Sequence, residues 1–321
     1  MAKRVYLIVV VFLGIGFSLP ADLHLSTQEE SSQIEVAVTP VRGGVHIVTG
    51  IGGNVAAFVG EDGVFLVDAG LSQLTERLLA SIQKLCGRES ANPALRYVVN
   101  THWHSDHTGG NETFAAAGAL VVAHENVLRL LSQDQVMAHL GDRLVPAVPT
   151  RARPRLTFND RMNLSWNQDL IHVVHVPNAH SNGDVIVHFR DADLIHMGDI
   201  LNGNYPFIDV DFEGHIGGII RAVEEVLAHS IESTLFIPGH GPMANREDLL
   251  RYKDMLTTVR DRVQAMIDRG MTRQEVIEAK PTADLDAVWS GGESADPFVE
   301  SVYDGMVRSR RTGARQDSRS R

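Results

Sequence analysis

The sequence has 321 residues, of which 44% are hydrophobic and 21% are charged, a balance typical of a globular protein with a full hydrophobic core. Its formal net charge of -11 at pH 7 argues against nucleic acid or an anionic membrane as a partner, because a net negative surface repels both. The single cysteine, Cys86, excludes a disulfide framework and a cysteine-rich zinc site. We therefore expect a small-molecule substrate, with any local positive charge supplied by metal.

The first residues have the order of a secretory signal peptide. Lys3 and Arg4 precede an apolar run from Val5 to Leu19, and Pro20 and Ala21 follow it. This predicts a signal peptide over residues 1–21 and a polar, flexible leader over 22–35. The run is shorter than the ~20 residues that span a bilayer, which favours cleavage, while an uncleaved anchor stays open. The expected mature protein is periplasmic or secreted and, after cleavage, has no stable membrane partner.

The next segment predicts an antiparallel meander. Short apolar or alternating runs at 45–48, 54–59 and 64–67 are separated by glycine-rich turns at 50–53 and 60–63. The loop 50–53 could fold over a pocket or could be a plain hairpin turn. After the third run, apolar residues recur at helical spacing over 71–86.

The densest chemistry lies in residues 101–111, directly after the apolar run 97–99, which predicts a buried strand. Four potential metal ligands fall within six residues: His102, His104, Asp106 and His107. Imidazole and carboxylate groups at the end of a strand suit Zn²⁺, and small residues after them let the backbone turn tightly around an ion. Asp68 ends a strand at the same predicted sheet edge, so we expect it to hydrogen-bond a ligand or its loop rather than only cap the following helix.

The remaining chain predicts alternating elements around one domain, residues 36–305. Helices are expected at 112–117, 126–131, 217–228 and 246–269, and strands at 120–123, 170–176, 185–189, 194–197 and 234–237. Residues 133–160, with three prolines, predict an irregular insertion that borders a site. Thr272 and Glu275 have the spacing of a capping box for one more helix. The Arg- and Ser-rich tail, 306–321, is predicted to be disordered.

Three further candidates follow apolar strands in the second half, each among small residues: His180, Asp199 and His240. Together with the first cluster they give seven potential ligands, five histidines and two aspartates. The histidines that lie within predicted strands, or without a pattern, are interpreted as packing or surface residues: His124, His139, His172, His175, His188 and His196.

This set of residues resembles the metallo-β-lactamase superfamily over about residues 45–240. The resemblance implies an α/β fold, an αββα four-layer sandwich of two mixed sheets with helices outside and a metal site at one edge. It implies two Zn²⁺ per chain, with Asp199 bridging them. The first ion would be held by His102, His104 and His180, and the second by Asp106, His107 and His240.

The resemblance also implies a mechanism and a pocket. Two such ions would lower the pKa of a shared water towards ~7 and polarise the bond to be cleaved. Asp106 would also orient the hydroxide proton, which makes Asp106 and Asp199 the catalytic carboxylates. The pocket walls are expected from Gly53 in the loop 50–53 and from Asn202, Tyr205 and Phe207 in the loop 202–207. Core packing of the two aromatic rings is an equal alternative.

The predicted function is therefore a secreted, zinc-dependent hydrolase. Aspartate at the bridging position is similar to the thioesterases, lactonases and phosphodiesterases of this fold, whereas β-lactamases carry cysteine or serine there, and Asn202 stands where a lactamase has lysine. β-Lactam hydrolysis stays open as a side activity. Two other readings are a mononuclear iron oxidoreductase similar to persulfide dioxygenases and a binding module with structural metal. Structural zinc sites are closed by four protein ligands, which disfavours the binding module. The sequence leaves the oligomeric state open.

Overall fold

The computed structural model describes residues 35–87 and 95–319, with side chains to residue 310. The compact unit of the structure begins at Glu35. The predicted signal peptide, 1–21, and all of the predicted leader except Glu35 lie outside the described residues. Within the described residues, no helix is both long and apolar enough to cross a membrane.

The first sheet has seven strands in the order β1-β2-β3-β4-β5-β6-β9. Its neighbours are antiparallel from β1 to β4 and parallel from β4 to β9, so the sheet is mixed, and its first part is the predicted meander. The strands are β1 (Ala37–Arg42), β2 (Val45–Thr49), β3 (Val55–Gly60), β4 (Gly63–Val67), β5 (Leu95–Val99), β6 (Leu120–His124) and β9 (Leu156–Phe158).

The second sheet has five strands in the order β10-β11-β12-β13-β14 and is also mixed. Only its last pair, β13 with β14, is parallel. The strands are β10 (Arg161–Trp166), β11 (Asp169–His175), β12 (Val185–Phe189), β13 (Leu194–Asn202) and β14 (Leu235–His240). A separate antiparallel hairpin consists of β7 (Gln135–Met137) and β8 (Arg143–Val145).

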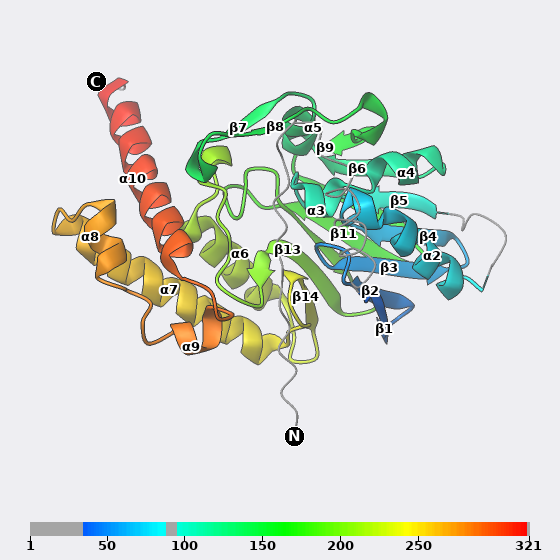
Figure 1. The fold of residues 1–321 in the computed structure, drawn as a ribbon. Helices are drawn as coiled ribbons and strands as arrows, with labels where there is room; N and C mark the ends of the chain where they lie inside the picture. The colour runs from blue at the N-terminus through cyan, green and yellow to red at the C-terminus, as the bar shows by residue number, and fades with distance from the viewer. Residues whose placement is uncertain (1–34, 88–94, 320–321) are drawn as a thin grey trace, which may run out of the picture. The chain divides into compact units, whose positions relative to one another are not determined.

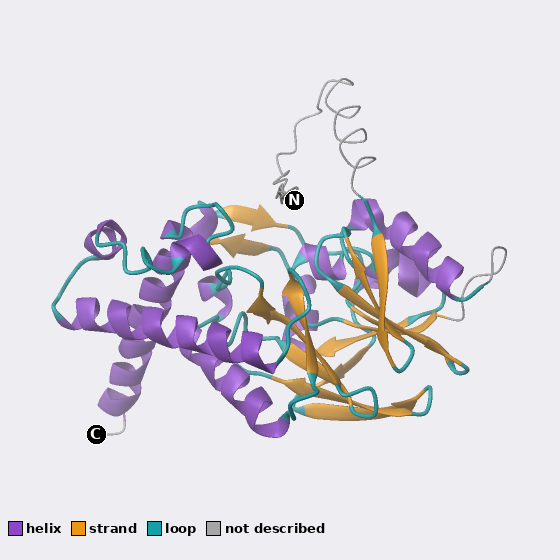
Figure 2. Ribbon diagram, turned by 90° about the horizontal axis from the view of Figure 1, so that it is seen from below, coloured by secondary structure: helices purple, strands orange, loops and turns teal. Residues whose placement is uncertain are grey.

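The helices lie on the outer faces of the two sheets, as Figures 1 and 2 show. The first sheet is accompanied by α2 (Thr75–Leu85), α3 (Ser105–Thr108), α4 (Asn111–Ala116) and α5 (Glu125–Leu131). The second is accompanied by α6 (Ile216–His229), α7 (Arg246–Asp268), α8 (Arg273–Glu278), α9 (Asp286–Trp289) and α10 (Asp296–Arg319).

Three buried apolar layers hold this arrangement together. One lies between the first sheet and α2 and α4, and another lies between the second sheet and α6, α7 and α10. The middle layer joins the two sheets, with Phe189 meeting Phe58 and Phe65 edge to face at ring-centroid distances of 5.5 and 6.1 Å. Helix, sheet, sheet and helix therefore follow one another, which is the predicted four-layer order.

Local sequence signals account for the helix starts in the C-terminal part. Asn245 and Asp248 form a reciprocal capping box at the start of α7, and Thr272 and Glu275 form the predicted one at the start of α8. The predicted helices 217–228 and 246–269 correspond to α6 and α7 within one residue at each end.

Two regions differ from the sequence prediction. The segment 133–160 is not irregular throughout, because it contains the β7–β8 hairpin and the short strand β9, which pairs with β6. From residue 306, where the sequence predicted a disordered tail, the structure continues α10 to Arg319. The start of α10 buries a helical stripe of apolar residues that fixes the helix on its neighbours: Phe298, Val299, Val302 and Met306.

Candidate metal centre

The seven predicted ligands meet at the edge where the ends of both sheets come together. The segment after β5 supplies four of them, and the loop after β11, the middle of β13 and the last residue of β14 supply the others. Asp199 lies within β13 rather than after it. Gly198 has a φ of +53°, and the pairing of β13 with β14 shifts register on both sides of it, so the strand bulges where it presents Asp199.

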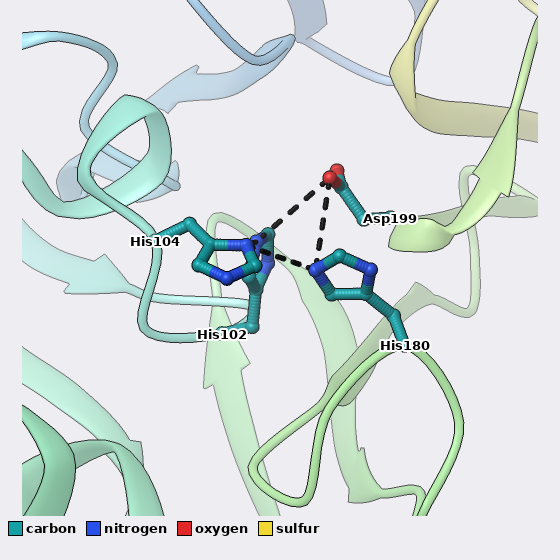
Figure 3. Close-up of side chains that lie close together, drawn as sticks. All are labelled: His102, His104, His180 and Asp199. Carbon is teal, nitrogen blue, oxygen red and sulfur yellow. Dashed lines mark hydrogen bonds and ion pairs between the residues drawn. The ribbon is translucent and has the colours of Figure 1, made fainter. Parts of the chain in front are cut away.

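The first group contains His102, His104, His180 and Asp199, drawn in Figure 3. Nδ1 of His104 lies 3.1 Å from Nε2 of His102 and 3.0 Å from Nε2 of His180. Oδ2 of Asp199 lies 3.9 Å from each of those two Nε2 atoms. Three ring nitrogens and a carboxylate oxygen thus converge on one point.

The second group contains Asp106, His107 and His240. Nε2 of His107 lies 3.3 Å from Nε2 of His240, and Oδ2 of Asp106 lies 3.1 Å from the same His240 atom. Asp199 reaches this group as well, with its Oδ1 3.1 Å from His107 and its Oδ2 3.6 Å from His240. Asp199 therefore lies between the two groups, as a bridging ligand would.

The outward-facing nitrogens show that these groups suit a cation. Thr101 Oγ1 donates its hydrogen to Asp68, so it must accept from Nδ1 of His102, 3.0 Å away. Nδ1 of His107 contacts Oδ2 of Asp68 at 2.7 Å, and Nδ1 of His180 contacts the Phe207 carbonyl oxygen at 2.8 Å. Since these acceptors hold the ring protons on the outside, lone pairs face inward.

A buried oxygen of Asp199 supports the same conclusion. Its Oδ1 is inaccessible to solvent and has no hydrogen-bond partner among the described residues, although His107 is close. A buried carboxylate oxygen without a partner is costly unless a cation balances it. The residues present therefore fit a pair of metal ions.

Burial and the neighbouring charges move the pKa values of the ligands in opposite directions. Burial lowers the pKa of His102 well below its usual value and that of His180 to about 4, which keeps both rings neutral. Burial opposes the charged form of His107 too, but Asp199 and Asp106 raise its pKa well above the usual value. A cation would replace the proton that these carboxylates attract to the second group.

The two groups differ in access to solvent. The side chains of His102, His107 and His180 are at most 1% exposed, whereas those of Asp106 and His240 are 31% and 30% exposed. The centre therefore opens to solvent on the side of Asp106 and His240, from which water or substrate could approach.

The predicted pocket residues separate into two sets. Phe207 lies at the centre, with its ring 5.8 Å from the rings of both His104 and His180. Tyr205 does not line this site, because it stacks on Phe298 of α10 and donates to Asp286. The structure thus places Tyr205 in the packing alternative and Phe207 beside the ligands.

Gly53 and Asn202 hold the loops that carry ligands. Gly53 is buried against His107, and its N–H donates to the Asp106 carbonyl oxygen at 3.1 Å. The loop 50–53 is thus packed on the ligand segment rather than folded over a pocket. Asn202 pairs in register with His240, and its side chain accepts from the N–H of Asn204.

Asp209 belongs to the centre but was not predicted from the sequence. Its side chain is fully buried, and Oδ2 lies 2.9 Å from Nε2 of His104 and accepts from Trp103 Nε1 at 3.0 Å. Asp68, which was predicted, makes the matching contacts on the other side, to Thr101 and His107. The sequence offered one weak signal for Asp209, an acidic residue directly after the apolar Phe207 and Ile208, but Asp211 and Glu213 follow it closely and do not stand apart from it.

Other histidines lie outside the two groups. His124 is buried and stacks on His175 at 3.6 Å between ring centroids, so it is a packing residue as predicted. His139, in the turn between β7 and β8, contacts Asp211 and stacks on Phe207. His196 lies in β13 and contacts the carbonyl oxygen of Asn54.

Comparison with known proteins agrees with this geometry. A family model described as the metallo-beta-lactamase superfamily matches residues 48–246. Among curated proteins, the chain is 25% identical over 219 residues to a hydroxyacylglutathione hydrolase from Erythrobacter litoralis, covering 64% of this chain and 78% of the relative. It is 28% identical over 206 residues to the acyl-coenzyme A thioesterase MBLAC2 from Gallus gallus, covering 58% and 71%. Among solved structures, a metallo-beta-lactamase from Pontibacter korlensis superposes with a TM-score of 0.54 and 19% identity, covering 70% of this chain and 99% of that one.

Proposed function

Because the chain belongs to the metallo-beta-lactamase superfamily, whose members similar to it are hydrolases, we propose that it is a zinc-dependent hydrolase with two ions per chain. The observation that carries the proposal is the pair of His/Asp groups that share Asp199. The preferred bond is a carboxylic thioester or ester. Lactones, phosphodiesters and the β-lactam amide are the other bonds to be tested.

The relatives and one loop residue support this choice of bond. Of the two curated relatives compared above, one is named a hydroxyacylglutathione hydrolase and the other an acyl-coenzyme A thioesterase. Asn202 lies three residues after the bridging position. Its side-chain oxygen accepts a hydrogen bond from the backbone N–H of Asn204, and it has no positive charge that could pair with the carboxylate of a β-lactam. A β-lactam would therefore be a slow side substrate.

The residues of the chain divide the work of such a reaction. When bound, zinc ions polarise a carbonyl oxygen and make water acidic enough to attack near neutral pH. The carboxylate of Asp106 is 31% exposed beside Nε2 of His240, so it can accept the proton of the attacking water and orient it. Phe207 supplies an apolar wall beside His104 and His180, which excludes water from that side.

A panel assay tests the proposal. Zinc-loaded protein is incubated in parallel with an acyl thioester, a lactone, nitrocefin and bis(p-nitrophenyl) phosphate, and bound metal is measured on the same sample. We expect about two zinc ions per chain and the fastest turnover on the thioester. His104→Ala should abolish turnover, whereas His172→Gln, a histidine of β11 outside both groups, should leave it unchanged. Fewer than one bound ion, or turnover that survives His104→Ala, would show that the proposal is wrong.

The same metal analysis separates zinc from the iron alternative. Bound iron together with oxygen uptake on thiol substrates would replace the hydrolase by an oxidoreductase. Catalytically inactive protein with two bound ions would instead favour a binding module.

We also propose that the protein is periplasmic or secreted. This rests on the charged start and the apolar run of residues 1–21. N-terminal sequencing of the protein from fractionated cells tests it, and a full-length chain in the cytoplasmic fraction would contradict it.

A further inference from the structure

Asp209 is anchored so that its carboxylate has one available orientation. Its backbone N–H donates to the carbonyl oxygen of His180, and its own carbonyl oxygen accepts from the N–H groups of Phe212 and Gly214. The side chain is 0% exposed. Oδ2 therefore meets Trp103 and His104 from a fixed position.

The chemistry of these three side chains determines where the His104 proton lies. An ionised carboxylate only accepts hydrogen bonds, and an indole N–H only donates. Oδ2 of Asp209 accepts from Trp103, and its second contact, to Nε2 of His104, requires a hydrogen on that nitrogen. In the neutral imidazole that binds a metal, Nδ1 of His104 is then left with its lone pair, and this atom faces His102 and His180 at 3.1 and 3.0 Å.

We propose that Asp209 is a positioning residue that fixes the tautomer and the ring plane of His104, so that Nδ1 is presented to the first ion. This inference rests on the proposed metal-dependent function. Carboxylates that hold the outer nitrogen of a metal-binding histidine make the ring a stronger ligand, and their loss typically lowers metal affinity or activity by about 10- to 100-fold.

The charges around Asp209 point in the same direction. Among the described residues, the carboxylate of Asp209 contacts the imidazole of His104, and no lysine or arginine side chain lies within ion-pair distance of it. Its Oδ1 is buried and has no hydrogen-bond partner in the described part of the chain. The imidazole of His104 thus lies between the negative charge of Asp209 and the first group, and a cation bound to that group would balance the charge.

A purely structural role is the competing explanation, because Asp209 also holds the buried ring of Trp103. Two variants separate the roles. Asp209→Asn keeps the shape of the side chain but adds an amide donor, so it no longer forces the hydrogen onto Nε2 of His104. Trp103→Phe removes the indole donor and leaves the contact between Asp209 and His104.

Asp211→Asn is the matched control. Asp211 lies two residues further along the same turn and also contacts a histidine, His139, but this histidine is in neither metal group. Zinc affinity is measured for each variant by competition with a chromogenic chelator, and cobalt-loaded protein is examined by visible absorption, which reports the ligands around the ion.

We expect Asp209→Asn to lower zinc affinity at the first group by about 10- to 100-fold and to change the cobalt spectrum, with the second group unaffected. Trp103→Phe and Asp211→Asn should bind as the wild type does. Wild-type affinity in Asp209→Asn, or an equal loss in Trp103→Phe, would overturn the inference. If the wild-type protein binds no zinc, the proposed function is overturned instead, so the two failures are distinguishable.

One measurement needs no variant. In zinc-loaded wild-type protein, ¹⁵N NMR of the imidazole nitrogens reports which nitrogen of His104 carries hydrogen. The inference requires hydrogen on Nε2, and hydrogen on Nδ1 would overturn it even if Asp209→Asn failed to fold.

Discussion

Replacing Gly53 by alanine tests how closely the ligand segment is packed. A Cβ at this position would lie 2.2 Å from Cε1, 2.6 Å from Nε2 and 2.7 Å from Nδ1 of His107. Carbon atoms in contact sit about 3.5 Å apart, so the ring and the new methyl group must separate by about 1.3 Å. The ring cannot retreat, because it is 0% exposed and Asp68 holds its Nδ1 at 2.7 Å.

The backbone of Gly53 is held as firmly as the ring. Its N–H donates to the Asp106 carbonyl oxygen, and the next N–H, of Asn54, donates to the carbonyl oxygen of Gly239 at 2.7 Å. Overpacking of this kind costs about 1–3 kcal/mol of folding free energy. A displacement of about 1 Å at a catalytic ligand lowers turnover about 100-fold.

The assay combines urea unfolding, metal content and turnover on the preferred substrate. Gly53→Ala should lose stability and turnover together and should lose metal from the second group first. Gly305→Ala, within α10, is the control. A Cβ there would meet its nearest atom, Cδ2 of His215, at an ordinary contact distance of 3.5 Å, so alanine should stabilise the protein by about 0.5–1 kcal/mol. A Gly53→Ala protein with two ions and wild-type turnover would refute the reasoning.

Three further substitutions probe the surroundings. Asp68→Asn keeps a residue that tolerates its φ of +69° but removes the carboxylate from His107, so chelator competition should show about 10- to 100-fold weaker binding at the second group; unchanged affinity would contradict this. Tyr205→Phe loses the bond to Asp286 and should lower stability in urea by about 1 kcal/mol with unchanged turnover, whereas slower turnover would return Tyr205 to the pocket. Burial lowers the pKa of His188 to about 4, below its unfolded value of about 6.5. Between these pH values the unfolded chain binds a proton that the folded protein does not, so the free energy of unfolding is highest above about pH 6.5 and falls as the pH drops towards 4. Urea melts of His188→Gln across that range should therefore show a smaller loss of stability than wild type, and an equal loss would show the pKa assignment to be wrong.

The positions of the ligands could be predicted because strand ends converge at sheet edges, and apolar runs mark those ends in the sequence. The bulge that brings Asp199 into line could not, since it depends on the left-handed backbone of Gly198 within a strand. Asp209 was missed because its partners lie more than 100 positions away in the chain, and no local pattern links them.

Two other errors have physical causes of the same kind. Arginines and polar residues dominate α10 from residue 306 onward, where the apolar stripe that includes Phe298 and Met306 ends, so this part of the helix was read as a disordered tail. The sequence could not choose between pocket and core for Tyr205 and Phe207, because the surroundings of each ring are set by segments distant in the chain: Phe298 of α10 for Tyr205 and His180 for Phe207.

The order of the strands along the chain has one more consequence. All strands of the first sheet end by Phe158, and the second sheet begins at Arg161. A chain cut between these two residues would separate into fragments that each contain an entire sheet, yet neither fragment would hold an entire ligand group, because both groups take side chains from both fragments. A metal ion bound there would therefore link the two halves of the chain. Removing it should weaken the association of the halves as well as abolish activity, and adding it should favour reassembly of the cleaved fragments.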